Sequence, residues 1–198
     1  MEFRTLGDSG LEISVIGLGT WAIGGGDWKF GWGDQDESEA IDTIVRSVDV
    51  GINWIDTAAI YGLGRSEELV GRALREIPAT ERPLLATKCG RTNVGNGELG
   101  KCLRRDSVMA ECEASLKRLG VECIDLYQMH WPEPDEEIEE GWQALIDLKQ
   151  QGKVRCLGVS NHSVKQMQRL QAMHPITSLQ PPVSYTHLRA HETYITIS

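Results

Sequence analysis

The sequence has no long hydrophobic run, and this absence excludes several classes of protein. The uncharged, glycine-rich stretch at residues 13–26 is only about 14 residues long, whereas a helix that crosses a bilayer needs roughly 20 apolar residues. The first residues, Met1 to Arg4, lead directly into patterned sequence without the apolar region of a signal peptide. We therefore expect a cytoplasmic protein without a membrane partner.

Positive charge and cysteine are also scarce. The chain has 20 Lys and Arg against 29 Asp and Glu, a formal net charge of −9, which argues against general nucleic-acid binding because phosphate contacts need a basic face. Five cysteines form no C-x-x-C pair, so neither a disulfide framework nor a structural zinc site is expected. His187 and His191 stand four residues apart, but they alone do not predict a metal site, and we expect none.

The chain does contain the pattern of a globular α/β domain. Apolar residues make up 40% of its 198 residues, enough for one domain with a sizeable core. Short apolar runs alternate with segments whose apolar residues recur three and four apart, which predicts βαβ units and a parallel sheet. The runs lie at 15–20, 52–56, 84–88, 124–130, 154–160 and 177–180, and the helical segments at 40–48, 69–74, 108–119, 138–146 and 164–173.

Polar or ionisable residues stand at the end of each predicted strand, which favours a (β/α)8 TIM barrel. Such barrels collect reactive groups from several strands at one rim. The segments 3–6 and 11–14 flank a Gly-Asp-Ser-Gly turn and predict a hairpin that could close the bottom of the barrel. Residues 17–22 fit G-x-G-x-x-A, but the glycine-rich sequence after them cannot open a helix, so a Rossmann site is not expected.

Four residues at these strand ends suggest a coupled acid: Asp56, Tyr61, Lys88 and His130. Each alone has an ordinary explanation, such as a turn cap or a buried histidine. Together they predict a tyrosine whose phenolate is stabilised by a lysine, a carboxylate that holds the lysine, and a neutral histidine that orients a carbonyl oxygen. This set can protonate an oxyanion as hydride reaches its carbon.

Several short motifs occur in a characteristic order, at residues 17–21, 53–58, 61–62, 86–88, 125–131, 158–161 and 179–180. With these motifs the sequence resembles the aldo-keto reductase superfamily, and in particular its bacterial branch, which is similar to the potassium-channel beta subunits. The resemblance implies a barrel that binds NADP(H) without a Rossmann motif, with Tyr61 as proton donor, Lys88 and Asp56 as its partners and His130 as substrate orienter. It further implies that Ser160, Asn161 and Gln180 hold the nicotinamide carboxamide, that Gly19, Thr20 and Trp21 line the cofactor and substrate mouth, and that Trp131 lies beside His130.

The resemblance ends after Pro182. We expect residues 1–183 to form a partial barrel of about six βα units, and residues 184–198 to be a non-native tail. In the family, the later units supply an aromatic platform under the nicotinamide and a basic cradle for the adenosine 2′-phosphate. Without them, the choice between NADP and NAD stays open, as do the substrate and the oligomeric state.

The predicted function is NADPH-dependent reduction of an aldehyde or ketone, a small carbonyl substrate, to an alcohol. Two alternatives stay open. One is a nicotinamide-binding regulatory subunit with little turnover, and the other is an inactive fragment of a reductase. The four residues of the coupled acid favour an enzyme. Tryptophans in the loops, among them Trp21, Trp28, Trp32 and Trp131, fit either an apolar substrate wall or ordinary half-buried packing.

Overall fold

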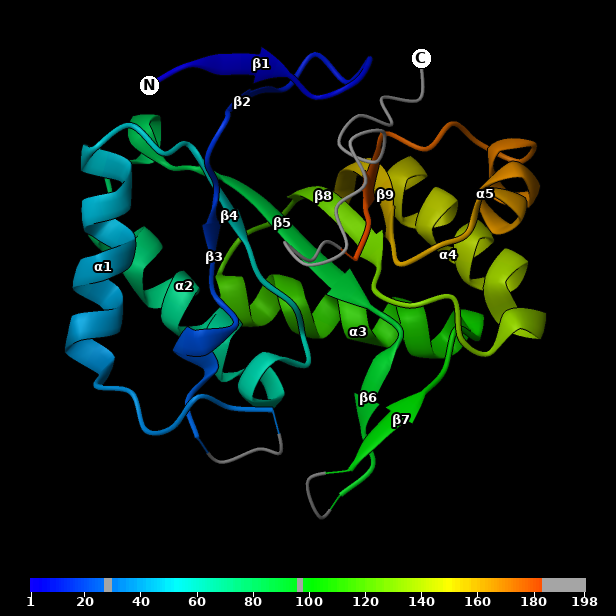
Figure 1. Ribbon diagram of the computed structural model, residues 1–198, viewed down its shortest axis with the longest axis horizontal. Coiled ribbons are helices and arrows are strands. Elements are labelled where there is room, and N and C mark those ends of the chain that lie inside the picture. The colour runs from blue at the N-terminus through cyan, green and yellow to red at the C-terminus, as the bar shows by residue number, and fades with distance from the viewer. Residues whose placement is uncertain (27–29, 96–97, 183–198) are drawn as a thin grey trace.

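The computed structural model describes residues 1–26, 30–95 and 98–182 (Figure 1). The predicted tail, Trp28 and the two histidines His187 and His191 lie outside the described residues. The predictions for those positions therefore stay predictions.

A curved sheet of six parallel strands forms the centre of the fold. Its order is β10-β9-β8-β5-β4-β3, so each barrel strand lies beside the next one along the chain. This arrangement confirms the incomplete barrel. The strands are β3 (Leu18–Gly19), β4 (Trp54–Asp56), β5 (Leu84–Cys89), β8 (Ile124–Met129), β9 (Val154–Ser160) and β10 (Ser178–Gln180).

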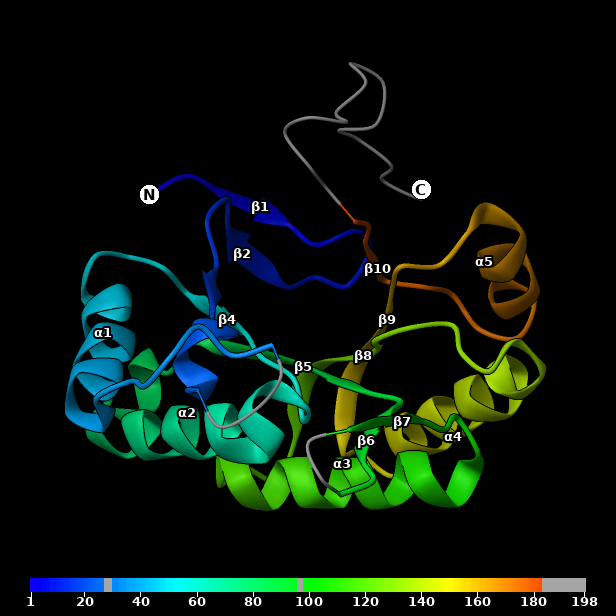
Figure 2. The ribbon, with the colours of Figure 1, turned by 60° about the horizontal axis from the view of Figure 1, so that its bottom comes forward.

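Helices cover the outer side of this sheet (Figure 2). Their apolar stripes pack against the strands in one core, in which Ile44, Leu69, Tyr127, Trp142 and Leu170 are almost completely buried. Because burial of each such side chain contributes about 1.5–3 kcal/mol, this core holds the layers together. The helices are α1 (Glu37–Asp49), α2 (Arg65–Glu76), α3 (Arg105–Leu119), α4 (Ile138–Gln150) and α5 (Val164–Gln171).

Side-chain caps fix the start of two helices. Asp36 accepts hydrogen bonds from the backbone N–H groups of Ser38 and Glu39 at the start of α1. Ser163 and Gln166 form a reciprocal capping box at the start of α5. Such caps satisfy N–H groups that lack a partner within the helix, so the sequence itself sets where these helices begin.

The predicted N-terminal hairpin is confirmed as β1 (Phe3–Thr5) and β2 (Glu12–Ser14). Its loop carries Leu11, which is buried in a small apolar cluster with Ala86, Leu126 and Cys156 of the barrel strands. Asn53 ties the hairpin to β4, since its side-chain oxygen accepts from the N–H of Ser14 at 2.7 Å. The hairpin thereby closes the inner side of the sheet away from the strand ends that carry the site.

A second hairpin, β6 (Arg91–Asn93) and β7 (Leu99–Lys101), was not predicted. It follows β5 directly and projects from the end of the sheet where the strands finish (Figure 1). Short 3-10 turns complete the structure at Ala22–Gly24, Tyr61–Gly64, Ala79–Glu81 and Asp135–Glu137. None of the helices described is both long enough and apolar enough to cross a membrane.

The strands β3 and β10 form the two edges of the sheet. In a closed barrel each strand has a neighbour on both sides, whereas within the described residues these two strands pair on one side only. The site described below lies at the carboxyl ends of the strands, between these two edges.

Candidate active site

Asp56 and Lys88 meet at the carboxyl ends of the neighbouring strands β4 and β5. The Lys88 ammonium lies 2.7 and 2.8 Å from the two Asp56 carboxylate oxygens and donates to the Thr57 carbonyl at 2.9 Å. Its side chain is only 1% exposed. A buried ammonium needs such compensation, because removing a charge from water is costly. The strands therefore present an ion pair that is already formed.

Tyr61 completes this arrangement from the turn after β4. Its hydroxyl accepts a hydrogen bond from Lys88 at 3.4 Å. The turn is possible because Gly62 has a positive φ of 58° and packs against Gly24, where an added Cβ would come within 2.1 Å of the Gly24 carbonyl oxygen. Glycine is therefore required at this position, and the close approach of the two loops fixes the tyrosine.

The surroundings of Tyr61 change one part of the sequence-based hypothesis. Lysine was expected to lower the pKa of the phenol, and Lys88 does act in that direction. Burial has the larger effect and raises the pKa above its usual value of about 10, and the Asp56 carboxylate raises it further. Tyr61 is therefore a protonated phenol at neutral pH, with the ammonium placed to stabilise the phenolate once the proton leaves.

His130 follows β8 and faces Tyr61. The two rings lie edge to face with centroids 5.7 Å apart. Burial, with the nearby charges of Lys88 and Arg91, lowers the pKa of His130 to about 3, so its imidazole is neutral at pH 7. Within the described residues its buried Nδ1 has no hydrogen-bond partner, a cost that a polar ligand in the site can remove.

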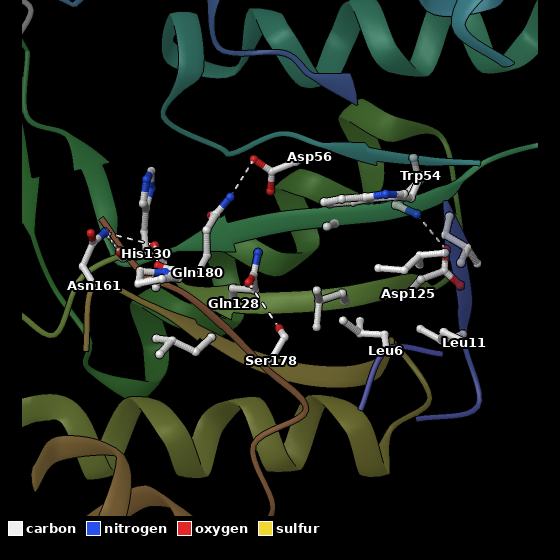
Figure 3. Close-up of a pocket in the computed structure, with 18 of the residues that line it drawn as sticks. Leu6, Leu11, Trp54, Asp56, Asp125, Gln128, His130, Asn161, Ser178 and Gln180 are labelled. Carbon is white, nitrogen blue, oxygen red and sulfur yellow. Dashed lines mark hydrogen bonds between the residues drawn. The ribbon is translucent and has the colours of Figure 1, made fainter. Parts of the chain in front are cut away.

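A group of amide and hydroxyl side chains, from Ser160, Asn161 and Gln180, lies near Asp56 and His130. Asn161 donates to the His130 carbonyl at 2.9 Å and to the Ser160 hydroxyl at 3.0 Å. Gln180 donates to Asp56 at 3.4 Å (Figure 3). Asn161 has a positive φ of 61°, a conformation that asparagine tolerates better than most residues. The structure thus brings together the three residues that were predicted to hold the carboxamide.

Two cavities share Tyr61 and His130 in their lining. One, of about 570 Å³, runs along the inner side of the sheet from Leu6 and Leu11 to Asp56, Tyr61 and His130 (Figure 3). The other, of about 670 Å³, lies outside the strand ends, with Tyr61 and His130 at its base. Both are in the usual size range of small-molecule sites. Tyr61 and His130 border both cavities. A group bound in one cavity could therefore react beside these two residues with a group bound in the other.

Trp21 and Trp131 border the second cavity, and their role as a substrate wall stays a prediction. Trp21 stacks on Tyr61 with ring centroids 6.2 Å apart, and the Arg91 guanidinium lies 5.4 Å from the Trp131 ring centroid. Both tryptophans are partly exposed. Sequence reasoning did not predict that the hairpin β6–β7 also borders this cavity, through Arg91, Leu99 and Lys101.

Gly19 and Thr20 lie at the carboxyl end of β3, beside Asp56 of β4. Thr20 is fully buried, its backbone N–H donates to the Asp56 carbonyl at 2.9 Å, and its hydroxyl donates to the same oxygen at 3.1 Å. Gly19 ends β3 directly opposite Asp56 in the register. The Thr20 side chain supports Asp56 from behind the sheet, so a direct contact of either residue with a cofactor stays a prediction.

The donor set fits the amide end of a nicotinamide cofactor. A carboxamide has one acceptor oxygen and two donor hydrogens, and the Asn161 and Gln180 amides with the Ser160 hydroxyl offer both kinds of partner at the edge of the 570 Å³ cavity. By contrast, the described residues contain no cluster of three or more His, Cys, Asp or Glu side chains that could hold a metal ion. All five cysteines are free thiols.

Comparison with known proteins relates the chain to one family of oxidoreductases. The Aldo/keto reductase family model matches residues 15–197. Aldo-keto reductase YhdN of Bacillus subtilis is 43% identical over 195 residues, which cover 98% of this chain and 57% of the relative. NADH-specific methylglyoxal reductase of Escherichia coli is 42% identical over 173 residues, 81% of this chain and 52% of the relative.

Solved structures agree with the fold. Glycerol dehydrogenase AKR11B4 from Gluconobacter oxydans has a TM-score of 0.81 and 44% identity, and the match covers 91% of this chain and 54% of that one. The holo form of aldo-keto reductase AKR11C1 from Bacillus halodurans has a TM-score of 0.80 and 30% identity, with 92% and 58% covered.

The present chain spans little more than half the length of these relatives. The family match runs past residue 183, so the non-native origin of residues 184–198 stays a prediction. With its parallel half-barrel and a family match over most of its length, the chain belongs to the Aldo/keto reductase family.

Proposed function

We propose that this chain carries the catalytic half of a nicotinamide-dependent reductase, which converts an aldehyde or ketone to an alcohol. The observation that carries the proposal is the continuous contact from the Asp56 carboxylate through the Lys88 ammonium to the Tyr61 hydroxyl. This contact ends where the two cavities meet, beside a histidine kept neutral by burial.

In this mechanism Tyr61 is the general acid. A nicotinamide cofactor, when bound, supplies the hydride. As negative charge develops on the carbonyl oxygen of the substrate, the Tyr61 hydroxyl transfers its proton to that oxygen, and Lys88 stabilises the phenolate that remains. Asp56 keeps the ammonium charged and in place. Neutral His130 orients the carbonyl oxygen, because its imidazole N–H can donate a hydrogen bond.

Ser160, Asn161 and Gln180 would hold the carboxamide and thereby decide which face of the nicotinamide ring is turned toward Tyr61. We propose NADPH as the reductant on the basis of the family resemblance. NADH is the other possibility, because the name of the Escherichia coli relative specifies NADH. Such binding would hold the reacting carbon close to the acid, and positioning of this kind contributes substantially to rate enhancement.

The substrate would enter through the 670 Å³ cavity. Trp21 and Trp131 line it together with Phe30, Ile60 and Leu99, so its wall is largely apolar, although Arg91, Glu98 and Lys101 add charge at the β6–β7 side. We propose a small aldehyde or ketone with an apolar substituent that packs against the two tryptophans.

The test uses a completed protein, in which residues 1–182 are joined to the C-terminal part of the Bacillus subtilis relative. NADPH and NADH oxidation are measured with a simple reactive aldehyde, alongside a Lys88→Met variant as control. We expect aldehyde-dependent oxidation in the completed protein and its loss in the variant. Cofactor binding without any aldehyde-dependent oxidation would contradict the proposal and favour a regulatory, nicotinamide-binding role.

A further inference from the structure

Three threonines lie side by side across the strand ends of the site. The register pairs Gly19 with Asp56 and Asp56 with Ala86. The next row therefore contains Thr20, Thr57 and Thr87, and all three are completely buried. Each stands next to a residue discussed above: Thr20 before Trp21, Thr57 after Asp56, and Thr87 before Lys88.

The threonines face away from the cavity. Successive side chains of a strand point to opposite sides of a sheet, and Asp56 lines the inner cavity. Thr57 and Thr87 consequently point outward, toward the helices. An apolar side chain is the usual occupant of such a position, because a buried hydroxyl costs free energy unless it has a hydrogen-bond partner. Three adjacent hydroxyls at this interface therefore need a dedicated set of partners.

The first residues of α2 provide these partners. The Ser66 hydroxyl donates to the Thr20 carbonyl at 2.9 Å and lies 2.8 and 3.0 Å from the hydroxyls of Thr20 and Thr57. The Thr87 hydroxyl donates to a Glu67 carboxylate oxygen at 2.6 Å. Ser66 and Glu67 are both completely buried. Two consecutive residues of one helix thus contact all three strand ends.

The charge of Glu67 is balanced from the next helix. Arg118 of α3 donates to the other Glu67 oxygen at 2.7 Å. One carboxylate therefore links α3, α2 and β5. A fully satisfied buried polar network of this kind restricts the relative positions of its members, and removing one partner leaves a buried group uncompensated.

The same helix end also carries the turn of Tyr61. The 3-10 turn Tyr61–Gly64 continues directly into α2 at Arg65, one residue before Ser66. The contacts of Ser66 and Glu67 with the threonines therefore fix the helix end from which the Tyr61 turn starts, while the contact of Gly62 with Gly24 holds the turn from its other side. The Tyr61–Lys88 contact, at 3.4 Å, is longer than an optimal hydrogen bond, so a small shift of α2 would break it.

We propose that Ser66 and Glu67 are positioning residues, which hold the Tyr61 turn at the distance from the Asp56–Lys88 pair that proton transfer requires. The importance of that distance for turnover rests on the proposed function. The geometric claim does not, since it concerns only how the three side chains are held in the folded chain.

The experiment observes the Tyr61 phenol directly in the completed protein used above, because the open sheet edges β3 and β10 are expected to make the 198-residue chain associate. Tyrosine labelled with ¹³C at Cζ gives a resonance that responds to hydrogen bonding at the hydroxyl. A Tyr61→Phe variant identifies the Tyr61 signal, and Lys88→Met gives the chemical shift of the phenol without its ammonium partner. Thr87→Val removes the hydroxyl that bonds Glu67 while keeping nearly the same shape, and Thr87→Ser restores a hydroxyl. Ser115→Ala serves as the matched control, because Ser115 is a buried hydroxyl that accepts a hydrogen bond from Arg118 and, in the part of the chain that the structure describes, makes no hydrogen bond to the strands.

We expect the Tyr61 signal in Thr87→Val to move at least half of the way toward its position in Lys88→Met. In Thr87→Ser and Ser115→Ala it should stay within about a tenth of that span. An unmoved signal in a folded Thr87→Val chain would overturn the proposal. If Thr87→Val does not fold, Ser66→Ala, which removes the hydroxyl that contacts Thr20 and Thr57, decides in the same way. Turnover is not part of this measurement, so a failure of the proposed function would leave its result readable.

Discussion

Lys88 and Asp56 form a buried ion pair across two neighbouring strands, with the ammonium 2.7 and 2.8 Å from the two carboxylate oxygens. The two residues are far apart in the sequence, and the parallel register of β4 and β5 brings them together. Because the pair is built into the folded strands, the proposed acid Tyr61 would need little rearrangement during the proposed reaction.

This relationship predicts a large stability effect. Asp56→Ala leaves the Lys88 ammonium buried at 1% exposure, and among the described residues its remaining partners are the Thr57 carbonyl and Tyr61. Breaking a buried pair by removing one partner costs about 3–5 kcal/mol. We expect a decrease of this order in the free energy of unfolding, measured by urea denaturation at pH 7. The double variant Asp56→Ala, Lys88→Met should recover part of the loss, and a single variant as stable as the parent chain would contradict the account.

His130 predicts a loss of stability in acid. Its pKa is lowered to about 3 in the folded chain from 6.5, so between these values the unfolded chain binds a proton that the folded chain does not. Stability is therefore complete above about pH 6.5 and decreases as the pH falls toward 3, by roughly 1.4 kcal/mol per unit. His130→Gln should reduce the slope of unfolding free energy against pH between 6 and 4. His174→Gln, after α5, is the control, and equal slopes in both variants would refute the assignment.

The buried carboxyl of Glu111 predicts the opposite pH dependence, a loss of stability as the pH rises. It accepts from the Gly90 N–H at 3.0 Å, at the point where β5 leads to the β6–β7 hairpin, and burial raises its pKa to about 7. A raised carboxyl pKa gives stability that is complete below about pH 4.5 and is lost as the pH rises through 7. We expect Glu111→Gln to be more stable than the parent chain at pH 8, by about 1–3 kcal/mol, and similar to it at pH 5. Exposed Glu113→Gln on the same helix should show no such difference.

The open edges of the sheet predict how the 198-residue chain behaves alone. β3 and β10 each pair on one side only among the residues described, and unpaired edges promote association. We expect a poorly soluble or oligomeric chain that binds NADPH very weakly. Size-exclusion chromatography, calorimetric unfolding and NADPH titration measure this. A monodisperse monomer with a sharp unfolding transition and micromolar NADPH affinity would show the prediction to be wrong.

Much of the fold could be predicted from the sequence, because buried strands and amphipathic helices leave a direct pattern of apolar residues. Each of the six runs contains a strand of the sheet, and each helical segment coincides with a helix. The hairpin β6–β7 was missed because Arg91–Asn93 is a short polar segment. Its pairing with β7 depends on register, which apolar periodicity does not encode.

The candidate site was partly predictable for a similar reason. Asp56 and Lys88 stand at the ends of recognisable strands, so the barrel hypothesis placed them together. The net pKa of Tyr61 could not be predicted, because it depends on burial that only the packed structure reveals. Nor could the contacts of Ser66 and Glu67 with the threonines, since a hydroxyl in a strand gives no signal about its partner on a helix.

Tyr61→Phe tests the central claim, that Tyr61 donates the proton. The variant removes only the phenolic hydroxyl and keeps the ring that stacks on Trp21. Because the hydroxyl acts in the transition state rather than in cofactor binding, we expect kcat to fall while the cofactor dissociation constant stays nearly unchanged.

The most direct measurement is the kcat of Tyr61→Phe in the completed protein, compared with the parent at the same pH and aldehyde concentration. Trp21→Phe, a change in the neighbouring ring, serves as the control for altered packing. General acid catalysis typically contributes about 10² to 10⁴ in rate, so the account predicts a loss of at least about 100-fold with unchanged cofactor affinity. A variant that keeps more than about a tenth of the parent kcat would contradict it.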